Sequence, residues 1–124
     1  MQIPAELKYT KDHEWARIDG NIATIGITDY AQSELGDVVY VELPEIGTQT
    51  TQGESFGTIE AVKAVSDLFA PFSGEVTEVN KKLNDQPEII NQDPYGEGWI
   101  IKIKISDKSE IDNLLDNKQY EELI

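Results

Sequence analysis

Cysteine is absent from the 124-residue sequence, and so are long apolar runs. The first absence excludes disulfides, thiolate zinc sites and thiol nucleophiles, and it is compatible with a reducing compartment. The second argues against a transmembrane helix, which needs about 20 consecutive apolar residues. Residues 1–10 also lack the apolar core of a signal peptide and the Arg-rich pattern of a transit peptide. We therefore expect a cytoplasmic protein, or an organellar protein from which a transit segment has been removed.

Basic residues are scarce as well, with 10 Lys and Arg against 24 Asp and Glu and a net charge of −14. This balance argues against binding to nucleic acid or to anionic membrane, since both require a basic surface. It is typical of a protein that docks on basic patches of larger partners, and it is equally consistent with a charge that serves only solubility. We expect a monomer. The 39% hydrophobic content suffices for one compact core, so residues 1–124 are predicted to form a single domain.

One lysine stands apart from this acidic background. Lys63 is the only Lys or Arg between Ile18 and Asn80, an interval that contains eleven Asp and Glu residues. A Schiff-base lysine needs a depressed pKa, but the neighbours Glu60 and Asp67 favour the charged form. The residues alone therefore argue against a catalytic amine and leave two interpretations of Lys63, an attachment point or a solvated surface residue.

The hydrophobic pattern predicts a mainly β protein. Alternating and Val-rich runs predict strands at 13–18, 22–27, 37–43, 54–62, 64–70, 75–79 and 99–105. Thr28 as N-cap and Gly36 as terminator bound a short helix at 28–35, and a further helical turn is predicted within 84–90. The core is expected over about 13–105, followed by two helices over about 107–123. Their expected apolar faces are Ile111, Leu114 and Leu115 in the first, and Tyr120, Leu123 and Ile124 in the second.

Two short segments resemble each other 38 residues apart, Gly36-Asp37-Val38-Val39-Tyr40-Val41 and Gly74-Glu75-Val76-Thr77-Glu78-Val79. Chance could produce this similarity between short Val-rich strands. Two similar halves would each supply strands to a two-layer sandwich-barrel, with the turn that contains Lys63 joining them and projecting at one end.

The run Glu60-Ala61-Val62-Lys63-Ala64-Val65-Ser66-Asp67-Leu68, followed by Pro71 and residues 73–76, resembles the lipoyl-attachment segment of the glycine cleavage H-protein family. Residues 7–15, 25–32, 35–44 and 94–99 resemble the family in the same order. Val62 and Ala64 do not match the Met residues that usually flank the modified lysine of biotin carriers. Val65 departs from the small residue that is usual in the family, and Phe69 occupies a variable position.

The resemblance implies a lipoyl/biotinyl-carrier-type antiparallel β sandwich-barrel with short peripheral helices and a C-terminal helical pair. It implies a non-catalytic carrier with lipoate attached covalently to Lys63. The implied partners are a pyridoxal-phosphate glycine decarboxylase, a tetrahydrofolate-dependent aminomethyltransferase, a dihydrolipoyl dehydrogenase that receives electrons, and the lipoate ligase or octanoyltransferase that loads the lysine. The aminomethyl intermediate would pass from the first enzyme to the second. An organellar member of the family would work in the mitochondrial matrix.

Members of this family are thought to shelter the cationic loaded arm in a surface cleft, where carboxylates would stabilise it. Glu14 and Asp67 match family positions that could serve, and Asp12 is a further candidate at a position where family members often have Ser. Each could instead be an ordinary exposed acid. His13, the only histidine, is expected to be structural because a transition-metal site would need a second His or Cys ligand.

Two alternatives to the glycine cleavage role remain open from the sequence. A carrier of this fold can also relay lipoyl or octanoyl groups to 2-oxoacid dehydrogenases. An unmodified acidic adaptor, which would bind a basic enzyme surface without any prosthetic group, is the alternative from a different class.

Overall fold

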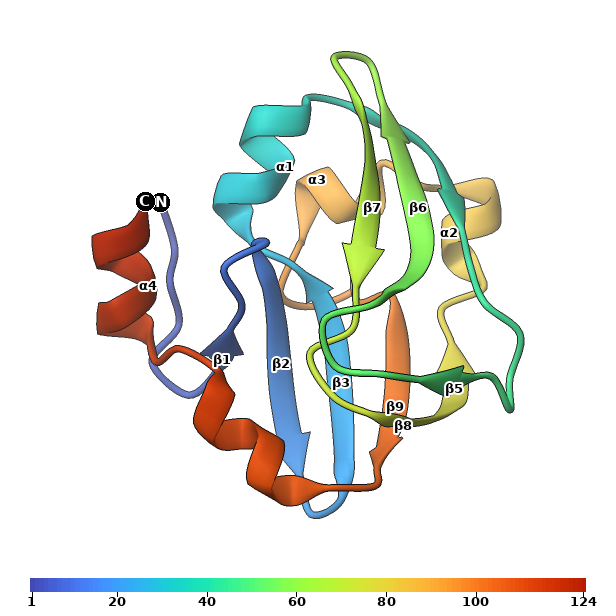
Figure 1. Cartoon of the computed structure of the whole chain (residues 1–124). Helices are drawn as coiled ribbons and strands as arrows, with labels where there is room; N and C mark the ends of the chain where they lie inside the picture. The colour runs from blue at the N-terminus through green and yellow to red at the C-terminus, as the bar shows by residue number, and fades with distance from the viewer.

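The computed structural model describes residues 1–124, which form two antiparallel sheets (Figure 1). The larger sheet has the strand order β1-β2-β3-β9-β8-β5, with β1 at Lys8–Tyr9, β2 at Glu14–Asp19, β3 at Ile22–Ile27, β9 at Ile101–Ile105, β8 at Gly74–Val79 and β5 at Gln49–Thr50. The smaller sheet has the order β4-β6-β7, with β4 at Val38–Glu42, β6 at Ser55–Ala61 and β7 at Val65–Phe69.

Short helices surround the sheets. They are α1 at Asp29–Leu35, α2 at Lys82–Asp85, α3 at Ile89–Gln92, the 3-10 helix η1 at Lys108–Asn113, and α4 at Asn117–Leu123. Thr28 caps α1 by accepting a hydrogen bond from Ala31 N, and Gly36 ends it with a φ of 80°. Both caps follow the sequence prediction, because a threonine hydroxyl satisfies an unpaired N–H and glycine tolerates positive φ. No helix of the structure is long and apolar enough to cross a membrane.

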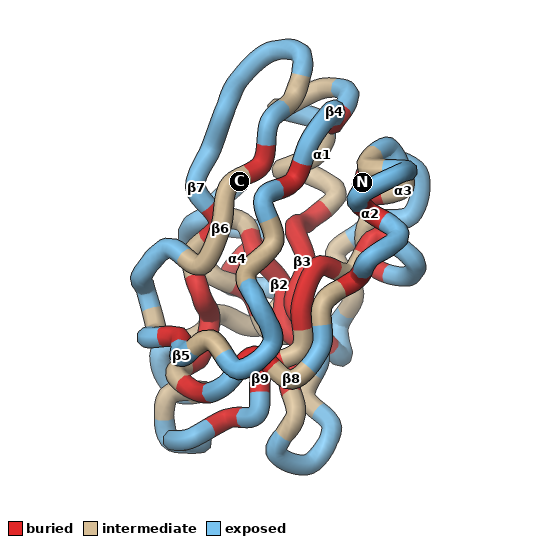
Figure 2. Tube along the Cα trace, turned by 90° about the vertical axis from the view of Figure 1, so that its right-hand side faces the viewer, coloured by how far each residue is buried: buried red, intermediate tan, exposed pale blue.

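The main hydrophobic core lies between the two sheets and draws on every long strand. Strand β9 shows why the pattern folds this way: Ile101, Ile103 and Ile105 are buried, while Lys102 and Lys104 lie on the other face. A second cluster on the outer side of β2 consists of Leu7, Tyr9, Trp15, Tyr95 and Tyr120. Figure 2 shows the buried residues concentrated along β2 and β3, and the hairpin of β6 and β7 projecting beyond them.

These features confirm the prediction of a mainly β sandwich with short peripheral helices. Each of the two similar halves supplies strands to both sheets, since β4 and β6 pair with β7 while β5 and β8 lie in the larger sheet. Of the predicted sandwich-barrel, the structure shows the sandwich, since the two sheets do not close into a single barrel.

Some details of the predicted elements are wrong. The two-residue strands β1 and β5 lie in segments where no strand was predicted, and the helical turn expected within 84–90 is two four-residue helices. Tyr120 is fully buried as expected, but Leu123 and Ile124 are 51% and 38% exposed. Helix α4 rests on the larger sheet through Tyr120, whose ring stacks on Tyr9, so its last turn has nothing to pack against.

Candidate functional site

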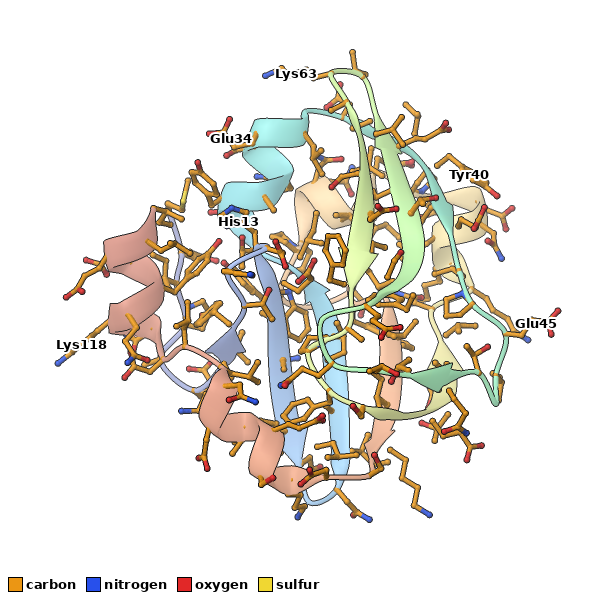
Figure 3. All side chains as sticks on the ribbon, in the orientation of Figure 1. His13, Glu34, Tyr40, Glu45, Lys63 and Lys118 are labelled. Carbon is orange, nitrogen blue, oxygen red and sulfur yellow. The ribbon has the colours of Figure 1, made fainter.

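Lys63 lies at the tip of the hairpin formed by β6 and β7, at the upper end of the molecule in Figure 3. The last paired residues are Glu60 and Val65, and Ala61 N donates a hydrogen bond of 2.8 Å to Ala64 O to close the turn. Lys63 is exposed and takes part in neither ion pair of the structure. Its amine is therefore accessible to a modifying enzyme.

The hairpin tip rests against the corner between α1 and β4. Val62 N donates to Asp37 O at 3.0 Å, and Lys63 N donates to Leu35 O at 3.3 Å. The methylenes of Lys63 lie against Gly36, where a Cβ atom would stand 3.4 Å from Lys63 Cγ, Cδ and Cε. These contacts fix where the lysine backbone lies and leave the amine free.

Asn91, on α3, holds this corner in place. Its Oδ1 accepts a hydrogen bond from Val38 N at 2.8 Å, while its Nδ2 donates to Gly36 O at 2.9 Å and to Gln32 Oε1 at 3.0 Å. One side chain thereby joins α1, β4 and α3. The sequence analysis did not identify Asn91, because no local pattern links it to residues more than fifty positions away.

A cleft of about 260 Å³ opens between α1, β7 and the start of β2. Asp12, Glu14 and Asp67 all contribute to its lining, so the structure brings the three predicted acids together. Lys63 is not part of the lining, but Leu35, which binds the Lys63 amide, is. A second cavity of about 330 Å³ adjoins the cleft at Asp12 and Glu14 and is bounded on its far side by the segment that follows η1.

Glu14 is buried at 1% exposure, unlike the ordinary exposed acid that the sequence left open. Its Oε1 accepts a hydrogen bond from Thr10 Oγ1 at 2.6 Å, and its Oε2 accepts one from Phe69 N at 3.2 Å. Burial raises the pKa of the Glu14 carboxyl to about 8, although both hydrogen bonds favour the charged form. At neutral pH the Glu14 carboxyl is therefore mainly neutral, and a cation in the cleft would favour its ionisation.

Thr10 orients Glu14. The Thr10 hydroxyl oxygen accepts hydrogen bonds from Asp12 N at 3.3 Å and Glu14 N at 3.1 Å, so its own hydrogen is directed to the Glu14 carboxylate. Asp12 and Asp67, by contrast, are exposed at the mouth of the cleft. The arrangement is one buried carboxyl with two exposed carboxylates beside it, which suits a small cationic group.

His13 also lines the cleft, and its ring is tied to the C-terminal helix. His13 Nδ1 lies 2.8 Å from the Tyr120 hydroxyl, and its ring lies 4.9 Å from the ring of Tyr30. Burial lowers the pKa of His13, against the opposing effect of Asp12 and Glu34. The predicted structural role of His13 is consistent with these contacts, but its place in the cleft wall was not foreseen.

Comparisons with known proteins agree on one family. The model of the family described as "Glycine cleavage H-protein" matches residues 7–124. Proteins named glycine cleavage system H protein from Symbiobacterium thermophilum and Geobacillus kaustophilus are 60% and 59% identical to this chain, covering 96% and 100% of it and 93% and 98% of their own lengths. The crystal structure of a glycine cleavage system H protein from Mycobacterium marinum superposes with a TM-score of 0.86 at 41% identity, covering 95% of each chain.

Proposed function

The chain belongs to the glycine cleavage H-protein family, and from this membership we propose that Lys63 carries lipoate in amide linkage at its Nζ. The family makes the protein a lipoyl carrier, a non-catalytic subunit that works with the other enzymes of glycine cleavage. The observation that carries the proposal is the position of Lys63. It is an unpaired, exposed amine at a projecting hairpin tip, and it is the only cationic side chain between Ile18 and Asn80.

The residues around Lys63 fit such an arm. Acylation converts the ammonium to a neutral amide, and no ion pair has to be broken for this to happen. The backbone bonds to Leu35 and Asp37 hold the attachment point firmly, so the protein controls where the arm begins. A tethered group of this kind reaches a high local concentration at each enzyme that docks on the tip.

Lipoate would supply the reactive dithiolane that accepts the aminomethyl group at glycine decarboxylase, releases it at the aminomethyltransferase and passes electrons to dihydrolipoyl dehydrogenase. The protein's part is to present the arm, to be recognised and to shield what the arm carries. A lipoate ligase or octanoyltransferase would load Lys63, in the cytoplasm for a bacterial cell or in the matrix for a mitochondrial form.

Glu14, Asp67 and Asp12 would hold the cationic end of the loaded arm in the cleft. The corner of α1 beside Lys63 contributes Leu35 to this cleft, so the arm's attachment point and its shelter share one element. Ionised Glu14 would be stabilised by the cation in addition to the donors Thr10 and Phe69 N. Exclusion of water by the cleft walls would slow hydrolysis of the carried group.

Mass spectrometry tests the attachment. Protein purified from its own source should carry the mass of one lipoyl group on the peptide that contains Lys63. Lys63→Arg should carry none and should support no glycine oxidation in a reconstituted system, whereas the matched variant Lys118→Arg, on α4, should behave as wild type. If Lys63→Arg restored glycine oxidation, the carrier assignment of Lys63 would be wrong and an unmodified acidic adaptor would be favoured.

The decay of the loaded arm tests the cleft. Glu14→Ala combined with Asp67→Ala should speed hydrolysis about 10-fold or more, because two charge-assisted contacts are lost. Asp19→Ala with Asp112→Ala removes two exposed acids outside the cleft and should leave the rate unchanged. An equal decay rate in wild type and the Glu14 and Asp67 double variant would remove these residues from the proposal.

A further inference from the structure

The only histidine lies in the wall of the proposed arm cleft and is joined by hydrogen bonds to an element remote in sequence. His13 Nδ1 is 2.8 Å from the hydroxyl of Tyr120, and this hydroxyl is 2.7 Å from Thr28 Oγ1. Thr28 Oγ1 in turn accepts the hydrogen bond from Ala31 N that caps α1. The chain of contacts therefore runs from the start of α1 through α4 to the cleft wall.

The directions of the hydrogen bonds among Thr28, Tyr120 and His13 follow from the requirement that each buried hydroxyl hydrogen has an acceptor. If Thr28 O–H donates to the Tyr120 oxygen, Tyr120 O–H can donate to His13 Nδ1, and every hydroxyl hydrogen has an acceptor. In the reverse order His13 Nδ1–H donates to Tyr120 and Tyr120 donates to Thr28, and the Thr28 hydrogen is left without an acceptor. Thr28 is fully buried, so the reverse order leaves its hydroxyl hydrogen without an acceptor and without access to water. The first order requires the neutral Nε2–H tautomer of His13.

The Nε2 atom faces solvent space. Nδ1 makes the only side-chain hydrogen bond of His13, and no buried side-chain nitrogen or oxygen of the structure lacks a partner. Nε2, which has no protein partner, therefore has access to solvent, and the cavity that His13 lines is the cleft. A neutral Nε2–H there is a hydrogen-bond donor without a charge.

The backbone holds the ring in this place. His13 has a positive φ of 72°, which is uncommon for a residue other than glycine. Two backbone bonds maintain it, from His13 N to Thr10 O at 3.1 Å and from Thr28 N to His13 O at 3.0 Å. His13 and Thr28 are thus connected twice, through the main chain and through the Tyr120 hydroxyl.

We propose that His13 is a positioning residue of the cleft, held by Tyr120 as the neutral Nε2–H tautomer so that the wall adds no positive charge. This inference rests on the proposed function for its consequence, because a cationic loaded arm would be repelled by an imidazolium. A neutral wall leaves Asp12, Glu14 and Asp67 free to act on the cation. It gives Tyr120, on a helix outside the cleft, a role in selecting what the cleft accepts.

The groups around the ring would otherwise favour its protonation. Asp12 and Glu14 flank it on its own segment, Tyr30 and Glu34 face it from α1, Asp67 faces it from β7, and Tyr120 contacts it from α4. Of these groups, Asp12 and Glu34 raise the pKa of His13, while the buried Glu14 is mainly neutral at pH 7. The hydroxyl donor at Nδ1 opposes them, together with burial, which lowers the pKa of His13.

Nitrogen-15 NMR on the unmodified full chain tests the tautomer directly, and the spectrum is unambiguous because the protein has one histidine. At pH 7 wild type should show a protonated Nε2 and an unprotonated Nδ1. Tyr120→Phe should make the two nitrogen shifts converge, as both tautomers become populated, and should raise the pH at which the ring titrates. The matched control is Tyr9→Phe, which removes the hydroxyl from the stacked neighbouring ring, where it bonds only to Pro4 O. A protonated Nδ1 in wild type, or unchanged shifts in Tyr120→Phe, would overturn the proposal.

Decay of the loaded arm tests the consequence. His13→Phe removes the ring nitrogens without adding a charge, so the decay rate should stay within about twofold of wild type. His13→Gln retains a neutral N–H donor and should stay within about twofold of wild type, and His13→Arg, which adds a cation, should be faster than His13→Phe. Equal rates in all three variants, with a sheltered arm in wild type, would refute the role of His13. An arm that decays in wild type as fast as in a free lipoyl peptide would instead refute the cleft of the proposed function, and the NMR result would still decide the tautomer.

Discussion

At the scale of single residues, the site depends on two opposing effects on the charge of the Glu14 carboxyl. Burial disfavours its charge, while Thr10 and Phe69 N donate hydrogen bonds that favour it. The sequence could place Glu14 among the candidates, but it could not show that this acid is buried while Asp12 and Asp67 are exposed. The difference arises because Phe69, 55 residues away, brings its backbone N–H to the Glu14 carboxyl.

The raised pKa of Glu14 predicts a pH-dependent stability. Because the folded-state pKa of about 8 exceeds the ordinary value of 4.5, the stabilising contribution of Glu14 is fully present below about pH 4.5 and is lost as pH rises through 8. Glu14→Gln cannot titrate, so its free energy of unfolding relative to wild type should rise by about 3 kcal/mol between pH 5 and pH 8. Urea denaturation of both proteins across this range measures the difference.

The change of this free-energy difference with pH separates the titration of Glu14 from the loss of contacts in the variant. Glu14→Gln offers one acceptor oxygen to two donors, so its NH2 group faces either Phe69 N or the Thr10 hydroxyl, which lowers stability by a similar amount at every pH. Asp112→Asn, which alters an exposed acid on η1 outside the cleft, is the matched control for the effect of removing one acid. A pH-independent difference for Glu14→Gln would show that the folded protein does not raise the pKa of Glu14.

At the scale of elements, the hairpin of β6 and β7 is positioned by its neighbours as well as by its own strands. Its tip bonds to Leu35 and Asp37, and Asn91 bonds to the chain on both sides of that corner. The turn could be predicted to project at one end, since two similar halves meet there. The support from α3 could not, because it depends on a single asparagine amide acting across more than fifty residues.

Asn91→Ala should loosen the tip. The variant leaves Val38 N, which belongs to a buried residue, without an acceptor and should cost about 2–3 kcal/mol of stability. Hydrogen exchange at the amides of Val62 and Lys63 should accelerate more than exchange at Ile25 in the larger sheet. Asn84→Ala, on the exposed surface of α2, is the matched control and should alter neither. Equal acceleration at the tip and at Ile25 would mean that Asn91 supports the whole fold rather than this corner.

The predicted elements failed where pairing or packing is set by distant residues. Strands β1 and β5 have two residues each, too few to show a period, and they form because β2 and β8 offer partners. In α4 the spacing of Tyr120, Leu123 and Ile124 indicated one buried face, yet only Tyr120 finds a partner, in Tyr9. Long alternating strands such as β9 were predictable because their two faces meet different surroundings over the whole length.

At the scale of the whole molecule, the shape of the protein distinguishes two ends, while its acids are spread over both. The β6 and β7 hairpin projects at one end, and the turn between β2 and β3 lies at the other (Figure 1). The net charge of −14 is carried by acids along the whole chain, including Asp37 and Glu60 close to the tip and Asp19 and Asp112 elsewhere. If Lys63 carries the proposed arm, a partner that accepts it would have to approach the tip, so the acids there should govern the encounter more than those at the opposite end.

Association kinetics distinguish a steering charge from one that serves only solubility. The rate of association with the proposed partner, dihydrolipoyl dehydrogenase, should fall about 10- to 100-fold between 0.02 M and 0.5 M salt. The reason is that the distance over which charges act in solution shortens to a few Å. Asp37→Asn with Glu60→Gln should slow association at low salt about threefold or more, while Asp19→Asn with Asp112→Asn, which has the same net charge, should have a smaller effect. Stopped-flow measurements on the loaded proteins would compare the two pairs. If both pairs of substitutions slowed association equally, the effect would belong to the total charge and not to the acids at the tip. If the association rate did not depend on salt, the acids would serve only solubility, and contact at the hairpin tip would govern recognition.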